Sequence, residues 1–311
     1  MKGALQRNMW SIGLAALLLL LLGLTRLIQP SFGASGLESL ARAALPFAFA
    51  TAAMVVVVLV GGIDLSVGAM MAVASVTAAL LMTTMGWVPA VALTLAVGLI
   101  MGAINGTLIV VTRVPDIVVT LAMLFVWEGS ALLIMESPGG TADRALTGLV
   151  RGWTGPVPTA LLVMTVCVAA LWAPLRRSRL GLCIYATGSD QEAAFRSGVA
   201  VGPTRIAAYA ICGLYCGMGG ISLVMLTGIG EPVPGPYLLA SVAAVVLGGV
   251  VLGGGRGGML GPIIAVFVLR IIRTMLTLSG VDPNVTTIVE GCIMVAVVML
   301  GGFIMLRGQR T

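Results

Sequence analysis

Charged side chains stand inside apolar stretches of this sequence, and their spacing allows them to form an ion pair or to meet a polar solute. Arg270 and Arg273 lie in one apolar run, and Glu290 lies in the next. A charge near the middle of a bilayer costs at least ~2.5 kcal/mol, so it usually faces a cavity or a partner. At ~1.5 Å per residue, the three side chains fall at matching depths on two antiparallel helices. The sequence therefore supports an internal ion pair, or a cationic feature of a permeation path that favours a polyol or an acidic solute.

Glu128, in the run that begins at Pro115, has two similar interpretations, because it could be a buried polar contact or line the path. The residues that we expect on such a path are Asn105, Glu128, Arg270, Arg273 and Glu290.

Most catalytic chemistry is excluded by composition. The sequence has no histidine, and its only lysine is Lys2. Imidazole catalysis, histidine metal ligation, Schiff-base lysines and a Walker A loop are therefore excluded. We also find no metal-ligand cluster, so we expect no metal, no cofactor bound by this chain and no enzyme activity.

The composition indicates an all-α integral membrane protein. Of 311 residues, 59% are apolar and 9% are charged, against roughly 25% charged in an average globular protein. A spanning helix needs about 20 mainly apolar residues, and cutting the chain at glycine, proline and charged clusters predicts about ten transmembrane helices. Their expected ranges are 10–28, 44–60, 64–82, 88–111, 115–135, 157–173, 205–226, 237–252, 259–278 and 284–306.

The distribution of arginine predicts the orientation. An even number of spans places both termini on one side, and cytoplasmic termini put eleven of the 17 basic residues inside and six outside. Basic residues favour the cytoplasmic side, so the net charge of +6 indicates topology and an anionic inner leaflet rather than a nucleic-acid partner. The polar segment 174–204 then lies in the cytoplasm.

This cytoplasmic segment contains a helix start signal. Ser189 and Glu192 match a capping box, and Asp190 adds a negative charge to the first turn. We expect a helix over about 189–199. Its small residues and the apolar side chain of Phe195 suit docking into a groove of another protein, although a solvated surface helix has the same pattern.

Glycine is arranged for helix packing in lipid. Gly98, Gly102 and Gly106 share one helix face, and Gly213 and Gly217 share another, as expected where backbones must approach closely. The segment 105–120 weakly resembles the segment 273–287 in sequence, and the predicted topology places the two on opposite sides of the membrane. This internal similarity predicts an inverted repeat of spans 2–5 and 7–10.

Two motifs give the sequence a family resemblance. The stretch Gly61–Gly68, Gly-Gly-Ile-Asp-Leu-Ser-Val-Gly, resembles the signature of ribose-type permeases, the membrane subunits of bacterial ATP-binding-cassette (ABC) sugar importers. The stretch Ala186–Val199 is similar to their coupling segment. Asn105-Gly106, Val114-Pro115 and Gly253–Gly255 also stand where the family has comparable residues.

The resemblance implies a single transmembrane permease domain over residues 1–311, of the type II importer kind, in the bacterial inner membrane. Its partners would be ABC ATPase subunits that hold ATP and Mg, a periplasmic solute-binding protein, and a second copy or a similar permease. The resemblance also assigns an ATPase-coupling role to part of the cytoplasmic segment. The residues concerned are Ser189, Gln191, Glu192, Ala193, Ala194, Phe195, Arg196, Ser197 and Gly198.

The signature itself is expected to be a structural elbow rather than a solute contact. Two glycines would make the turn, Asp64 would cap the third span, and Ser66 would satisfy free amides. The elbow residues are Gly61, Gly62, Asp64, Ser66 and Gly68.

The sequence differs from the ribose-type family at two positions that bear on the solute. A second class of transporter also remains compatible with the sequence. Arg270 and Arg273 stand where relatives more often carry asparagine or small residues, which argues against plain ribose. The alternative is an ion- or proton-coupled secondary transporter or channel in which Glu128, Glu290 and the arginines relay charge. The docking helix and the few intramembrane carboxylates favour the permease.

Overall fold

The computed structural model describes residues 2–233 and 235–308, which form a bundle of helices with one small hairpin. The helices are α1 (Lys2–Ile28), α2 (Ala34–Leu59), α3 (Val67–Leu81), α4 (Trp87–Thr112), α5 (Asp116–Ile134), α6 (Arg144–Gly148), α7 (Thr159–Arg177), α8 (Arg179–Ser189), α9 (Gln191–Arg196), α10 (Val201–Thr227), α11 (Tyr237–Leu247), α12 (Leu260–Leu278) and α13 (Pro283–Gly308). The strands β1 (Trp153–Thr154) and β2 (Val157–Pro158) pair antiparallel, with Trp153 opposite Pro158.

The helical membrane architecture expected from composition is present. Among the described residues, seven helices are long and apolar enough to cross a bilayer, and α3, α11 and the stretch Pro283–Val297 are shorter apolar helices. Each of the ten expected segments coincides with one of these helices. The boundaries differ in places, since α2 begins ten residues before position 44 and α11 ends at Leu247 instead of 252. The chain leaves α11 there because Gly249 has a positive φ of 81°.

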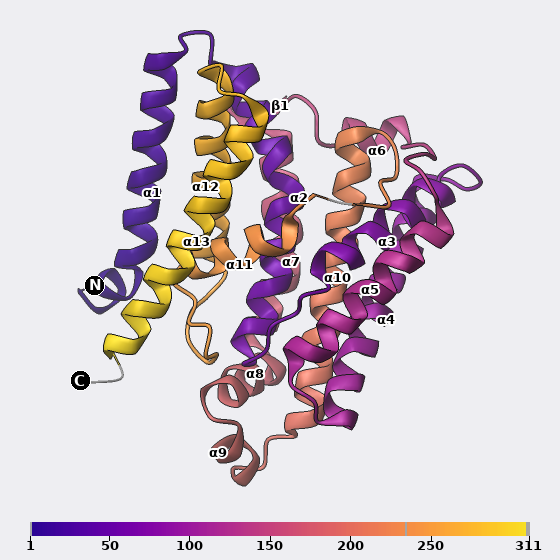
Figure 1. Ribbon diagram of the computed structural model, residues 1–311, viewed down its shortest axis with the longest axis vertical. Helices are drawn as coiled ribbons and strands as arrows, with labels where there is room; N and C mark the ends of the chain where they lie inside the picture. The colour runs from indigo at the N-terminus through magenta and orange to yellow at the C-terminus, as the bar shows by residue number, and fades with distance from the viewer. Residues whose placement is uncertain (1, 234, 309–311) are drawn as a thin grey trace.

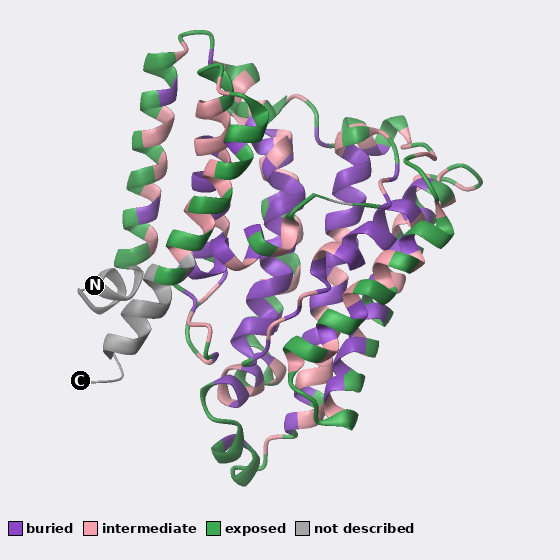
Figure 2. Ribbon diagram, in the orientation of Figure 1, coloured by how far each residue is buried: buried purple, intermediate pink, exposed green. Residues whose placement is uncertain are grey.

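The core of the bundle is formed by α2 and α10. Nearly every residue from Leu40 to Leu59 is buried, as Figure 2 shows along the length of α2. Helix α10 packs on α2, α3 and α4. The two glycine faces predicted for lipid packing meet here, because a Cβ at Gly102 would clash with the Tyr209 carbonyl and one at Gly213 with the Gly98 carbonyl. Only glycine permits this approach of α4 to α10.

The helices around this core form two groups with the same packing pattern. Helices α3 and α4 pack on α10, and α5 packs on α3. Likewise, α11 and α12 pack on α2, and α13 packs on α11. Both α3 and α11 begin about halfway along the bundle and run in opposite directions (Figure 1).

The outer faces and the ends of the bundle fit a membrane setting. Helices α1, α4 and α5 expose large apolar side chains such as Leu19, Ile100 and Phe125, as helices in contact with lipid do. The start of α1 and the end of α13 lie near each other at one side of the molecule, and the pair α8–α9 lies at its lower end (Figure 1).

Candidate functional site

The elbow between α2 and α3 is a sharp turn that requires glycine at two positions. Gly61 has a φ of 88°, a conformation that other residues rarely adopt. A Cβ at Gly62 would overlap the Asp116 carboxylate and lie 2.6 Å from the Tyr209 hydroxyl. At Gly68 a Cβ would meet nothing within 4 Å, so the structure gives no packing reason for that glycine.

Asp64 holds the start of α3 from within the elbow. Its side chain is fully buried, and its Oδ1 accepts hydrogen bonds from the Ser66 amide at 2.8 Å and the Ser66 hydroxyl at 2.7 Å. The expectations that Asp64 caps this helix and that Ser66 satisfies free helix amides are both wrong, because no side-chain cap bond is formed at α3. Asp64 accepts from the N-cap residue Ser66 itself, and the Ser66 hydroxyl donates to Asp64. The helix consequently begins at Val67, after this turn.

Asn105 extends the elbow's polar contacts to α4 and α5. Its amide nitrogen donates to Ser66 Oγ at 2.8 Å and to Asp64 Oδ2 at 3.3 Å. Its amide oxygen accepts from Trp127 Nε1 at 3.1 Å. A buried polar group costs free energy unless it is hydrogen-bonded, and here Asp64 and Asn105 satisfy each other. Asn105 therefore lies in a rigid buried network.

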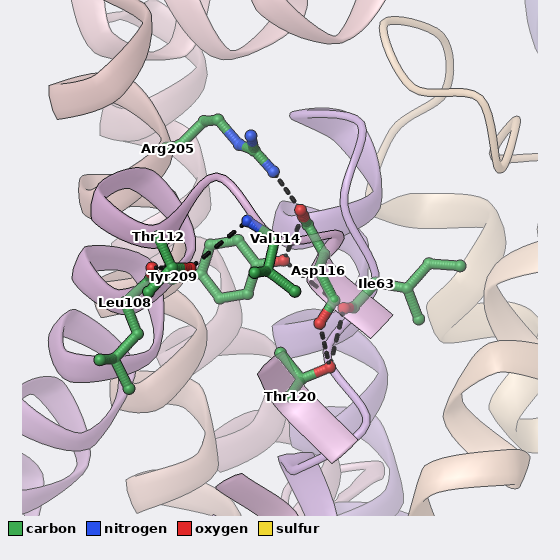
Figure 3. Close-up of polar contacts among 8 residues, drawn as sticks. All are labelled: Ile63, Leu108, Thr112, Val114, Asp116, Thr120, Arg205 and Tyr209. Atoms are coloured by element: carbon green, nitrogen blue, oxygen red, sulfur yellow. Dashed lines mark hydrogen bonds and ion pairs between the residues drawn. The ribbon is translucent and has the colours of Figure 1, made fainter. Parts of the chain in front are cut away.

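A second cluster ties the same elbow to the starts of α5 and α10 (Figure 3). Asp116, the first residue of α5, pairs with Arg205 through Oδ1 and accepts a hydrogen bond from the Tyr209 hydroxyl through Oδ2 at 2.6 Å. The Thr120 hydroxyl lies 2.8 Å from the Asp116 carbonyl and 3.3 Å from the Ile63 carbonyl of the elbow. The elbow, α5 and α10 are thus joined at one point.

The residues of this cluster were not identified from the sequence as site residues. Asp116 and Arg205 are 89 residues apart, so no local pattern connects them. The available signal was that a charged residue stands at the start of two apolar segments on the same predicted side of the membrane, as Asp116 and Arg205 do. The arrangement joins three elements through one carboxylate, and its role is the positioning of helices.

The polar segment after α7 forms two helices instead of one. Helix α8 runs through Ser189, whose hydroxyl donates to the Tyr185 carbonyl at 2.9 Å. Asp190 is the N-cap of α9 and accepts from the Ala193 amide at 2.9 Å. The capping box of Ser189 and Glu192 is therefore wrong, because Ser189 is still helical and cannot cap. Helix α9 is also shorter than the expected 189–199.

Within this segment, Phe195 is the large apolar side chain that is presented outward on α9. It is 70% exposed, whereas Ala194 is 5% exposed and faces the protein. Ala194 is therefore not free to contact a partner, contrary to its expected place on an exposed face. The remaining coupling residues, all exposed, are Ser189, Gln191, Glu192, Ala193, Arg196, Ser197 and Gly198.

Helix α8 is docked on two other segments through backbone contacts. A Cβ at Gly188 would clash with the Leu59 carbonyl at the end of α2 and lie 2.6 Å from the Gly255 amide. The Gly255 amide in turn donates to the Leu59 carbonyl at 3.0 Å. The Tyr185 hydroxyl donates to the Gly257 carbonyl at 2.9 Å, and burial raises the pKa of Tyr185 above its ordinary value, so it stays a donor.

At this junction, α8 thus contacts both the elbow and the loop between α11 and α12. The glycines there have backbone conformations or close approaches that other residues cannot match, notably at Gly61 and Gly254. We call this place, defined by Gly61, Gly188 and Gly253–Gly255, the glycine junction.

A cavity of about 230 Å³ lies elsewhere, between α2, α11, α12 and α13. It is lined by Phe47, Gly235, Pro236, Tyr237, Ala240, Arg270, Arg273, Glu290 and Met294. Arg273 forms an ion pair with Glu290 at 2.6 Å. The structure is thus compatible with both interpretations of these charges, an internal ion pair and a polar feature of a path, because the ion pair exists and it lines a cavity.

The structure does not bring all five expected path residues together. Arg270, Arg273 and Glu290 share the cavity, but Asn105 belongs to the elbow network. Glu128 is half-buried on α5, away from the cavity, and forms no ion pair with a described residue.

Comparison with known proteins identifies a family that matches the chain and several permeases that are similar to it. Residues 36–298 match the family described as branched-chain amino acid transport system / permease component. The chain is 32% identical over 292 residues to the ribose import permease protein RbsC of Escherichia coli strain K12, which covers 91% of both chains. It is 29% identical over 307 residues to the autoinducer 2 import system permease protein LsrD of Escherichia coli O9:H4 strain HS, covering 93% of this chain and 91% of that one. No solved structure matches the chain.

Proposed function

The chain belongs to the branched-chain amino acid transport system / permease component family and is a sugar-type permease subunit of an ABC importer, and we propose that it works as one half of a dimer driven by separate ATPase subunits. Its relatives support the permease interpretation and give no support to a secondary transporter or channel. As a member of this family it is a non-catalytic, multi-pass protein of the inner membrane. The ATPase would hold ATP and Mg, and a periplasmic solute-binding protein would deliver the solute.

The docking of α8 at the glycine junction carries this proposal. Helix α9 presents Phe195 outward while α8 contacts the elbow and the loop after α11. An exposed aromatic side chain on a short helix suits a groove in a partner. A movement imposed on α9 would therefore reach both segments directly through α8.

From the elbow, the movement would pass into the bundle through polar contacts. Asp64 and Ser66 are hydrogen-bonded to Asn105 on α4, and Thr120 on α5 contacts the Ile63 carbonyl. Tyr209 and Arg205 connect α10 to the same point through Asp116. The elbow would thus move α4, α5 and α10 as a unit during alternating access.

The orientation of the chain follows from the same assignment. The segment 174–204 would face the cytoplasm, together with both termini, and this agrees with the excess of basic residues expected on that side. The hairpin of β1 and β2 and helix α6 lie toward the other end (Figure 1), where the solute-binding protein would dock.

We extend the proposal to ten membrane-spanning helices with an inverted repeat of α2–α5 and α10–α13. The support is the matching packing pattern of the two groups and the opposite directions of α3 and α11. These two helices have 15 and 11 residues and hold the second place in each group. Short segments in corresponding positions of two halves are typical of transporters built from inverted repeats.

Reconstitution tests the function directly. The full chain is placed in proteoliposomes with its proposed ATPase subunits, with ATP inside and the solute-binding protein outside. Labelled pentoses, hexoses, polyols and sugar acids serve as solutes. We expect uptake of at least one solute that requires internal ATP. Uptake by the chain alone under an ion gradient would contradict the proposal.

A further inference from the structure

The cavity beside α11 has a lining with excess positive charge. Its one carboxylate, Glu290, is paired with Arg273 at 2.6 Å. Arg270 lines the same cavity and forms no ion pair with any described residue. Its Nε is buried without a hydrogen-bond partner, and its guanidinium lies 5.4 Å from the centre of the Phe47 ring. Two arginines therefore share one carboxylate in this cavity, and the lining keeps an excess of one positive charge.

The start of α11 adds to this positive potential. Gly235, Pro236 and Tyr237, at the N-terminus of the 11-residue helix, line the cavity together with Arg270. The N-terminus of a helix carries a partial positive charge and unpaired amides that favour anions. No side chain caps this end, because the N-cap residue is Pro236. Glu231, on the preceding segment, is not among the lining residues.

Helix α3, the other short helix, differs from α11 in having a carboxylate in the segment directly before it. Helix α3 begins at a similar depth, but the elbow directly before it carries a carboxylate, Asp64, which accepts a hydrogen bond from the amide of the N-cap residue Ser66. Among the described residues, the segment leading into α3 thus supplies a carboxylate of its own, whereas Gly235 and Pro236, which lead into α11, supply none, and Glu290 of α13 is the carboxylate beside that helix start. Two arginines and a helix N-terminus facing one cavity with a single, already paired carboxylate leave room for one more negative charge.

We propose that this cavity binds the carboxylate of the transported solute, and that the solute is a monosaccharide acid. The inference rests on the proposed function and narrows its solute class. A guanidinium binds a carboxylate through two parallel hydrogen bonds, and Arg270 has buried donor capacity available for it. The cavity volume of about 230 Å³ is below the roughly 300–1,000 Å³ of sites for drug-sized ligands, so the cavity suits only a small solute such as a monosaccharide.

Binding to the full chain tests the charge preference. The chain is placed in nanodiscs of phosphatidylcholine, and binding of labelled D-galacturonate is compared with that of D-galactose, which differs at one carboxylate. We expect the acid to bind at least about tenfold more tightly, since a charge-assisted hydrogen bond contributes about 1.5–3 kcal/mol. Equal binding, or absence of binding by the acid, would overturn the inference.

Variants locate the site. Arg270→Gln should remove the preference, Arg270→Lys should retain part of it, and Arg144→Gln, at an exposed arginine on α6, should leave it unchanged. Arg270→Gln also loses the contact of the guanidinium with the Phe47 ring, so Arg270→Lys, which keeps a cation at this position, controls for a loss of stability, and the melting temperature of each variant is measured beside its binding. A preference that survives Arg270→Gln would place the anion elsewhere and overturn the assignment.

Two further experiments distinguish a solute from a lipid as the occupant of the cavity, and this inference from the proposed function. Nanodiscs with added phosphatidylglycerol test a lipid phosphate as the occupant, and loss of galacturonate binding there would identify the cavity as a lipid site. In the complete importer, ATP-dependent uptake of galactose without galacturonate would overturn this inference and leave the proposed function standing. Uptake that does not depend on ATP would overturn the proposed function instead.

Discussion

Arg205, in the first turns of α10, forms an ion pair with Asp116, the first residue of α5. Both side chains are largely buried, and the Tyr209 hydroxyl donates to the same carboxylate at 2.6 Å. One carboxylate thus holds together two helices that are far apart in the sequence, directly against the elbow.

Asp116→Asn should destabilise the protein by about 1–3 kcal/mol, because it leaves a partly buried guanidinium without its counter-charge. Arg205→Gln should have a similar effect, and the double variant should lose less than the sum of the two. Thermal unfolding of the purified chain measures all three. Additive losses would show that the two residues do not interact.

Gly62→Ala should lower both stability and uptake, because its Cβ would overlap the Asp116 carboxylate and crowd the Tyr209 hydroxyl. Overpacking of this kind costs about 1–3 kcal/mol. Gly68→Ala is the matched control in the same motif, since its Cβ would meet nothing within 4 Å. Equal behaviour of the two variants in melting and uptake assays would contradict the close packing of Gly62 against Asp116 and Tyr209.

Phe195→Ala should reduce solute uptake by the assembled importer at least about tenfold, since a buried aromatic anchor often contributes 2 kcal/mol or more to an interface. The fold should be unaffected, because Phe195 is 70% exposed. Leu182→Ala on α8, with 72% exposure, is the control. Co-purification of the ATPase and its ATP-dependent transport are the measurements, and normal coupling in Phe195→Ala would exclude this side chain from the ATPase contact.

Gly188→Ala should separate ATPase binding from transport. Its Cβ would clash with the Leu59 carbonyl and force α8 away from the glycine junction, while Phe195 stays accessible on α9. We expect the ATPase to co-purify normally and to hydrolyse ATP with little uptake. Gly258→Ala, at a position with open space around its Cβ, should behave as the unmodified protein. Full uptake by Gly188→Ala would show that the junction does not transmit movement.

Exchange of Arg273 and Glu290 separates the structural and solute-binding roles of their ion pair. Arg273→Gln alone leaves the partly buried Glu290 carboxylate without its ion-pair partner, which costs about 1–3 kcal/mol. The double exchange, Arg273→Glu with Glu290→Arg, should restore most of the stability because the pair is re-formed. If the pair also positions the solute, uptake stays low in the exchanged protein. Recovery of both properties would assign the pair to structure alone.

The sequence predicted where the helices lie better than how they begin. Hydropathy decides which segments enter a bilayer, so all ten apolar segments coincide with helices. The start of α9 was misplaced because Ser189 and Asp190 are both good N-cap residues, and the choice depends on how far α8 continues. That length is set by its docking through Gly188, which no local pattern records.

The candidate site was predictable only where its residues stand close together in the sequence or interrupt an apolar run. The elbow glycines and Asp64 stand in one continuous motif and were found from it. The pairing of Asp116 with Arg205 depends on α5 and α10 meeting in space, so the sequence showed only two isolated charges. The charges at Arg270, Arg273 and Glu290 were visible because they interrupt apolar runs, and their matching depths predicted the contact between Arg273 and Glu290 that the structure contains.

The short helices α3 and α11 determine where a solute lies in the electric field across the membrane. At ~1.5 Å per residue they extend only about 22 and 16 Å, less than the ~30 Å thickness of the hydrocarbon layer. A solute held at the start of α11 therefore sits within the voltage drop of the membrane. For an anion, completing the inward journey opposes an interior-negative potential, at about 2.3 kcal/mol per charge for each 100 mV. Hydrolysis of a nucleotide can supply that work, which is one reason for a cell to import such a solute with a pump rather than a passive pore.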